Sequence, residues 1–303
     1  MPPAAEIGRI VGVGSATIDH FAVVDRYPEP GTHNDLAGLS IQGGGTAATA
    51  IATLARFGVP TAFVGMLADD DAAAFIARGL EGLGVDVSAL RRDGGRLSPH
   101  RYLIHERIKS RTTVLATAGD VRSLRPADVD LGVLDGAALL LVDGGHVPAQ
   151  NLLAEEARKR GIRVLLDAGA LREGMGELLA LSDVLVASER FASEVAPQGE
   201  LEDCLAELVR MGPQQAVITL GAEGCVGLSD GKIYRQPAAR VEVVDALGAG
   251  DVFVGALAYA VAQRWDFARS LEFSSRAAAL SCLEIGSRAG LPALDEVLAF
   301  DNG

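Results

Sequence analysis

Short apolar runs alternate with longer segments of helical period along most of this chain. The apolar runs are typical of strands buried on both faces, and the segments between them are typical of helices. Such strands form a parallel sheet that helices cover on both sides. The predicted strands are 7–14, 61–66, 137–143, 162–167, 183–188 and 215–220, and the predicted helices are 46–57, 71–83, 149–160, 200–211, 251–264 and 268–284.

Two stretches interrupt this alternation. The first predicts strands over 20–27 and 34–41 with no helix between them, and the second predicts a hairpin over 98–106 and 110–117. We expect these four strands to form a small antiparallel sheet, built from two insertions at about 18–42 and 97–118. The whole chain, 1–303, is therefore predicted to be one α/β domain with a β-sheet lid.

Composition excludes several classes of protein. The 27 basic and 40 acidic residues give a formal net charge of −13, which argues against a nucleic-acid partner. No apolar run approaches the roughly 18 residues of a membrane span, and the first residues, which include Glu6, do not resemble a signal peptide. The three cysteines show no C-x-x-C spacing, which favours a reducing, cytoplasmic setting.

The segment Val244-Asp-Ala-Leu-Gly-Ala-Gly-Asp-Val-Phe253 carries the strongest chemical signal. Small residues precede a helix whose first turn contains Asp251. Unpaired N–H groups at a helix start can hold a transferring phosphoryl group, and a carboxylate there can take the proton of an attacking hydroxyl. The alternative is that Asp251 only caps its helix.

Two further segments favour a polyol site. Gly12-Val-Gly-Ser-Ala-Thr-Ile-Asp19 lacks the third glycine of a dinucleotide fingerprint, but it places Asp19 at the carboxyl edge of the sheet, where ligands bind. A carboxylate there can accept hydrogen bonds from two adjacent hydroxyls, or it can satisfy a turn. Gly43-Gly44-Gly45 opens an Ala-rich helix and lets a ligand approach the backbone, although a plain loop is the alternative.

The remaining signals are weaker. Gly221-Ala-Glu-Gly224 follows a predicted strand and suits either a loop beside a nucleotide or a simple turn. His100 and His105 share no helical face with acidic residues, so they do not predict a metal site. A Walker-type phosphate loop is absent from the sequence.

Taken in order, these motifs resemble those of the ribokinase-like (PfkB) carbohydrate kinases over nearly the whole chain. GGGTAATAIATLARFG is similar to the N-terminal signature of the family and VVDALGAGDVFVGALA to its C-terminal signature. The resemblance is closest to the ketohexokinase-like and sulfofructose-kinase-like branches. It implies a three-layer α/β/α sandwich with a β-lid, ATP as phosphoryl donor, Mg²⁺ and a sugar hydroxyl as acceptor. Because the outer face of the predicted lid needs cover, we also expect a homodimer in which two lids pair.

The resemblance also implies roles for individual residues. Asp251 is the catalytic base, with Gly248, Ala249 and Gly250 as the anion hole. Sugar-binding positions are Asp19, Gly44, Gly45, Thr49 and Arg111, the last being a lid-strand arginine that contacts the substrate and the moving phosphoryl group. ATP-binding positions are Ser188, Thr219, Gly221, Gly224, Ala278 and Cys282, and a site for a monovalent cation such as K⁺ involves Asp245 and the backbone near Gly286.

The chain departs from the family pattern at two places. The N-x-x-E motif, linked to Mg²⁺ and phosphate, falls on Ser188-Glu189-Arg190-Phe191, so the placement of Mg²⁺ is open. The segments GGGTAATA, LADDD and SRAGLP resemble sulfofructose kinases, but Thr32 and Gly145 stand where those enzymes hold the sulfonate. We therefore expect a neutral ketose or a similar small polyol. Sulfofructose, a nucleoside, or a sensor that binds without phosphoryl transfer are the alternatives.

Overall fold

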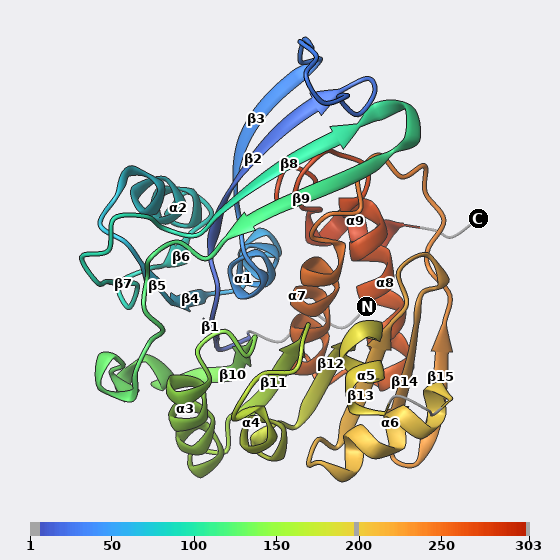
Figure 1. Ribbon diagram of the computed structural model, residues 1–303. Helices are drawn as coiled ribbons and strands as arrows, with labels where there is room; N and C mark the ends of the chain where they lie inside the picture. The colour runs from blue at the N-terminus through green and yellow to red at the C-terminus, as the bar shows by residue number, and fades with distance from the viewer. Residues whose placement is uncertain (1–6, 197–199, 301–303) are drawn as a thin grey trace.

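The computed structural model describes residues 7–196 and 200–300, and within them lies a nine-stranded sheet. Its strands are β1 (Arg9–Val13), β4 (Thr61–Val64), β6 (Val85–Asp86), β10 (Ala137–Val142), β11 (Arg163–Ala168), β12 (Val184–Ser188), β13 (Gln215–Thr219), β14 (Cys225–Ser229) and β15 (Lys232–Gln236). They lie in the order β15-β14-β13-β12-β11-β10-β1-β4-β6 (Figure 1). In this order, every pair of neighbouring strands from β13 to β6 is parallel. The β14–β15 hairpin adds two antiparallel strands at the edge next to β13. The carboxyl ends of the parallel strands therefore meet along one edge.

Helices cover both faces of this sheet. One face packs against α1 (Thr46–Arg56), α2 (Asp71–Glu81), α7 (Ala249–Ala262), α8 (Phe267–Ser281) and α9 (Leu294–Ala299). The other packs against α3 (Val147–Lys159), α4 (Met175–Leu181), α5 (Glu189–Val195) and α6 (Leu201–Arg210). Along β10, Leu139 and Leu141 enter the first core, while Leu140 and Val142 enter the second. This alternation, expected of a strand buried on both faces, confirms the three-layer α/β/α prediction.

The lid is a four-stranded sheet that stands above the carboxyl edge of the central sheet (Figure 1). It contains β2 (Thr17–Val24), β3 (Gly38–Gly44), β8 (His100–Glu106) and β9 (Arg111–Thr117), in the order β3-β2-β8-β9. The expectation of a wholly antiparallel lid was wrong, because β2 pairs parallel with β8. Both strands leave the body of the protein at the same edge, so they run in the same direction.

The element bounds differ most from the predictions in the lid. The strand predicted at 20–27 lies at Thr17–Val24, and the one predicted at 34–41 lies at Gly38–Gly44, because the chain stays extended into the glycine run. The six predicted helices begin and end within three residues of the prediction. The shorter elements are β5 (Met66–Leu67), β7 (Arg91–Arg92) and the 3₁₀ turns η1 (Arg107–Lys109), η2 (Pro126–Asp128), η3 (Leu131–Leu134) and η4 (Gly221–Glu223).

None of the helices described is long and apolar enough to cross a membrane.

α7 packs closely on α1, and Gly255 makes this approach possible. A Cβ atom on Gly255 would lie 2.6 Å from the carbonyl oxygen of Ala50 and 2.8 Å from the Cβ of Thr53. Both contacts are shorter than carbon atoms tolerate, so any side chain at this position must push the two helices apart.

We expect Gly255→Ala to lower the free energy of unfolding by about 1–3 kcal/mol, as overpacking does. Gly79, in α2, is the matched control, because a Cβ there meets nothing within 4 Å. Gly79→Ala should raise the free energy of unfolding by about 0.5–1 kcal/mol through the lower chain entropy of the unfolded state. Urea unfolding of both variants checks the pair, and equal effects would contradict this account of the packing.

Candidate active site

The start of α7 holds the candidate base beside free N–H groups. Gly248 precedes the helix with φ 80°, a left-handed conformation that glycine adopts without strain. Asp251 is the third helical residue. Within the described residues, the N–H groups of Gly250 and Asp251 find no acceptor, whereas the N–H of Ala249 donates to the carbonyl oxygen of Ala246 (3.3 Å). The free N–H groups and the helix dipole favour an anion at this position.

The carboxylate of Asp251 is half-buried, and no hydrogen bond to it forms within the described part of the chain. Burial raises the pKa of Asp251 to about 7. The positive charge of Arg101 lowers this pKa, and that of Arg288 does so more weakly. The negative charges of Asp143 and Asp19 raise it further. A carboxylate with a pKa near 7 is largely ionised at slightly alkaline pH and still basic enough to take a proton from a hydroxyl.

Asp19 lies on β2 at the base of the lid and is fully buried. Its Oδ1 accepts a hydrogen bond from the hydroxyl of Thr17 (2.6 Å), and its Oδ2 accepts one from the hydroxyl of Ser287 (2.9 Å). Gly44 leaves room for this carboxylate, since a Cβ on Gly44 would lie 2.1 Å from Oδ2 of Asp19. The structure thus brings two of the predicted sugar-binding positions into contact.

The other predicted acceptor positions lie at the start of α1. Gly45 precedes that helix with φ 94°, and a Cβ on it would lie 2.5 Å from the Cα of Ala16. Thr49 is fully buried one turn into the helix. Glycine is therefore required where the loop passes beneath the lid.

Two arginines that the sequence analysis did not single out complete this region. Arg101 lies on β8 directly beside Asp19 in the lid register, and it is the charged neighbour with the largest effect on the pKa of Asp251. Arg288, in the segment after α8, donates from Nη2 to the carbonyl oxygen of Gly44 (2.8 Å). Neither arginine could be placed without knowing the β2–β8 register and the path of the chain after α8.

The structure does not bring Arg111, the predicted lid arginine, to Asp251. Arg111 pairs with Glu106 at the end of the β8–β9 hairpin, and its Nε donates to Oε2 of Glu106 (2.7 Å). Its side chain is 60% exposed. Side chains alternate between the faces of a sheet, so Arg111 lies on the lid face opposite to Arg101.

Next to Arg111, the lid contacts the loop before α7. The hydroxyl of Thr112 donates to Oδ1 of Asp245 (3.0 Å), which also accepts the N–H of Leu247 (3.3 Å). Oδ2 of Asp245 accepts the N–H of Gly286 (3.1 Å). The predicted cation-site residues, Asp245 and Gly286, are therefore adjacent, and the backbone N–H of Gly286 donates to the carboxylate of Asp245.

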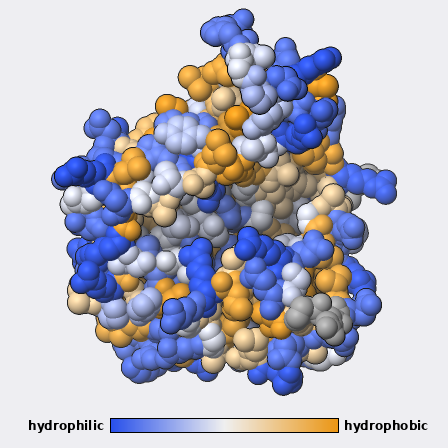
Figure 2. Space-filling model, viewed as in Figure 1, coloured by the Kyte–Doolittle hydropathy of each residue, from blue (hydrophilic) through white to orange (hydrophobic). Residues whose placement is uncertain are grey.

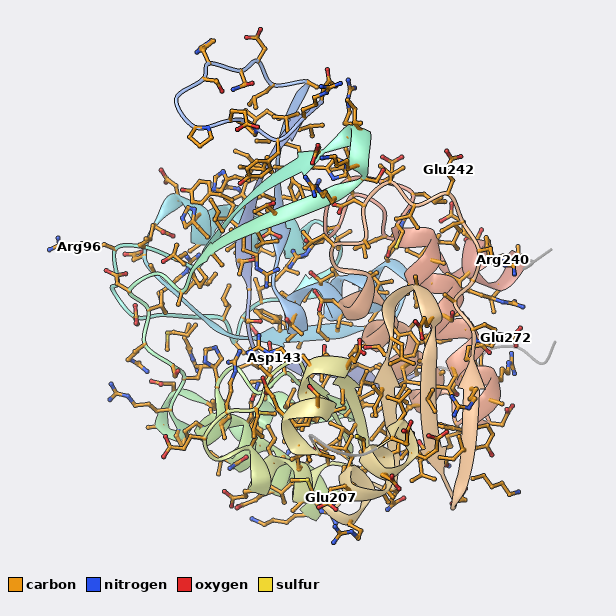
Figure 3. All side chains as sticks on the ribbon, turned by 45° about the vertical axis from the view of Figure 1, so that its right-hand side comes forward. Arg96, Asp143, Glu207, Arg240, Glu242 and Glu272 are labelled. Carbon is orange, nitrogen blue, oxygen red and sulfur yellow. The ribbon has the colours of Figure 1, made fainter. Side chains whose placement is uncertain are left out.

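Two more carboxylates lie at the carboxyl edge of the sheet. Asp143, just after β10, is at the centre of the molecule in Figure 3 and accepts hydrogen bonds from five donors. Asp167, on β11, is 9% exposed, and within the described ranges it accepts none. Burial raises the pKa of Asp167 well above its ordinary value, and the charges of Asp251 and Asp143 raise it further.

The predicted nucleotide positions gather at the ends of β12 and β13 and at α8. Ser188 and Thr219 are register partners, and the hydroxyl of Ser188 caps α5 by accepting the N–H of Phe191 (3.0 Å). Gly221 begins η4 and Gly224 follows it, both with positive φ. Cys282 ends α8, and its Sγ lies 3.2 Å from the carbonyl oxygen of Ala278.

In Figure 2 the face between the lid and the central sheet is hollowed.

Comparison with known proteins identifies the class of enzyme. The family model described as pfkB family carbohydrate kinase matches residues 8–294. A ribokinase of Staphylococcus aureus is 27% identical over 95% of this chain and 98% of its own. An ATP-dependent ribose-1-phosphate kinase of Halopiger xanaduensis is 28% identical over 96% and 97%. The structure of Arabidopsis thaliana ribokinase with ribose and ATP superposes with a TM-score of 0.82, at 25% identity, over 98% of this chain and 100% of that one.

The chain belongs to the pfkB family of carbohydrate kinases. It is an ATP-dependent sugar kinase of the ribokinase type.

The pKa of Asp251 predicts the pH dependence of catalysis. A base works only when deprotonated, so kcat/KM should fall as the pH drops through about 7. Arg101→Gln removes the charge that lowers this pKa most, so the acid limb of the profile should move to higher pH and kcat should fall by about 10²-fold. Arg111→Gln, which alters an exposed lid arginine, should leave the limb in place. A pH–rate profile of the three proteins measures this, and a limb near pH 4 would refute it.

Proposed function

We propose that this kinase transfers the γ-phosphoryl group of ATP to a hydroxyl of a small sugar, a ketose or a similar polyol. The observation that carries the proposal is the juxtaposition of the Asp251 carboxylate with the unpaired N–H groups of Gly250 and Asp251. A protein that only bound sugar and nucleotide would need no base there. The names of the relatives include ribose and ribose 1-phosphate as acceptors, so they do not select one sugar.

The proposed transfer assigns a task to each group. The acceptor oxygen bonds to the γ-phosphorus as the bond to the β,γ-bridging oxygen breaks, and ADP leaves with that electron pair. The proton of the acceptor hydroxyl passes to Asp251. The N–H groups at the start of α7 stabilise the charge on the transferring oxygens, and Arg101 adds a positive charge from the lid. The carboxylate of Asp19, at the base of the lid, orients the acceptor by accepting hydrogen bonds from the hydroxyls of the sugar.

Bound Mg²⁺ would neutralise charge on the triphosphate. The N-x-x-E positions do not fit this task, because Phe191 is fully buried and the hydroxyl of Ser188 caps α5. No group of three or more metal-ligating side chains forms among the described residues. Asp167 is the carboxylate best suited to hold a hydrated Mg²⁺, since it is buried at the sheet edge without a hydrogen-bond donor. A K⁺ site at Asp245 and the backbone near Gly286 stays a proposal, since the three hydrogen bonds that Asp245 accepts leave one of the about four acceptor positions of a carboxylate.

The outer face of the lid supports the proposed homodimer. Leu39, Ile41, Tyr102 and Leu115 lie on the face opposite to Asp19, and they are 69%, 47%, 51% and 56% exposed. Figure 2 shows apolar side chains gathered on the lid. Pairing with a second lid would remove this apolar surface from water.

ADP release on an acceptor panel of fructose, ribose, sulfofructose and adenosine tests the function. At least one acceptor should stimulate ADP release, and Asp251→Asn should lower kcat on it by about 10²–10⁴-fold, the usual worth of a general base. The melting temperature of Asp251→Asn should be no lower, because the variant removes a half-buried charge and Asn suits helix starts.

Two results would contradict the proposal. Tight acceptor binding with no ADP release on any acceptor would favour a sensor. Turnover of Asp251→Asn near that of the unaltered protein would show that Asp251 only shapes the start of its helix.

A further inference from the structure

Arg288 lies among the residues proposed to bind the acceptor. Besides the hydrogen bond from Nη2 to the carbonyl oxygen of Gly44 (2.8 Å), its Nε lies 3.5 Å from Oγ1 of Thr49. Gly43 leaves space for the guanidinium, since a Cβ on Gly43 would lie 2.4 Å from Nη1 of Arg288. The backbone N–H of Arg288 donates to Oε1 of Gln42 (3.3 Å), which holds the segment after α8 against β3. The side chain is therefore positioned by contacts on both sides.

The positive charge of Arg288 has no ion-pair partner in the part of the chain that the structure describes. Asp19 is near enough to act on it through its charge, but the two oxygens of Asp19 accept hydroxyls of Thr17 and Ser287 instead. Within the described residues, Nη1 donates no hydrogen bond. Burial lowers the pKa of Arg288 to about 10, so the group is still protonated at neutral pH.

Keeping a guanidinium without an ion-pair partner in a partly buried site costs free energy. Neutral polyols do not require this cost, because backbone N–H groups and carboxylates suffice to bind hydroxyls. An anionic group on the ligand would repay it, since a guanidinium binds phosphate, sulfonate and carboxylate with charge-assisted hydrogen bonds.

We propose that Arg288 forms a subsite for an anionic substituent of the acceptor, so that the preferred substrate is a sugar bearing a phosphate, sulfonate or carboxylate group. The inference deepens the proposed function and rests on it. It replaces the neutral acceptor expected from Thr32 and Gly145, because Arg288 supplies a positive charge at a different position. The competing explanation is that Arg288 only balances the charge of buried Asp19, in which case neutral and anionic acceptors would depend on it alike.

The test compares matched acceptors with the full-length protein, ATP and Mg²⁺. The pairs are fructose with fructose 6-phosphate and with sulfofructose, ribose with ribose 1-phosphate, and glucitol with gluconate. We expect at least one anionic acceptor to exceed its neutral partner in kcat/KM by about 10–100-fold, the usual worth of a hydrogen bond to a charged group. The best arm identifies which anion the subsite takes.

Arg288→Gln should bring that ratio to within about threefold of one, and Arg288→Lys should retain part of it. Arg96→Gln is the matched control, since Arg96 is exposed and points away from the body in Figure 3. This control should keep the full ratio. A ratio of one or less in every pair, or an equal loss on both members of each pair in Arg288→Gln, would overturn the subsite.

Binding separates this inference from the proposed function. The dissociation constants of the same pairs, measured by calorimetry with a non-hydrolysable ATP analogue, report the subsite without turnover. Preferential binding of an anionic acceptor, lost in Arg288→Gln, supports the subsite even if no ADP forms, in which case only the transfer reaction fails. Turnover of neutral acceptors without any anionic preference leaves the kinase function standing and refutes the subsite.

Discussion

Burial of a carboxylate that receives no hydrogen bond is the interaction on which the proposed chemistry of this kinase depends. Asp251 is half-buried at the start of α7, and that burial raises its pKa to about 7. The surrounding structure maintains this environment: Gly255 lets α7 lie close to α1, and Gly248 turns the chain into the helix. The lid then places Arg101 close enough to limit the rise, so that the proposed base is strong and yet ionised in a useful pH range.

The carboxylates along the carboxyl edge of the sheet differ in how many hydrogen bonds they accept. Asp143 accepts from Ser15, Ala47, Gly145 and Gln150, and these bonds join the turn after β1 to the starts of α1 and α3. Asp143 thereby holds these three segments together at the sheet edge. Asp167 and Asp251 lack such donors, so their protonation can change with pH or with a bound cation.

Local patterns in the sequence predicted the layers of the fold and the position of the proposed base. Apolar alternation identified six sheet strands and six helices, because a strand buried on both faces has a composition unlike that of its flanking helices. The segment 244–253 indicated the start of α7 and Asp251.

The β14–β15 hairpin was missed, although Asp230-Gly231 carries a hairpin turn signal, with both residues at positive φ. Arg101 and Arg288 were also missed, since they reach the site through strand register and through a contact between Arg288 and Gly44 that spans most of the chain.

The most direct test of the account is to observe the protonation of Asp251 itself. Infrared difference spectra between acidic and alkaline samples, taken for the protein labelled with ¹³C-aspartate and for its Asp251→Asn variant, isolate the carbonyl stretch of this one carboxyl group. The Asp251 band should disappear as the pH is raised, with a midpoint near pH 7, because burial raises the pKa of this group. A midpoint near pH 4, the ordinary range for an aspartate, would show that burial does not prepare this group to act as the base.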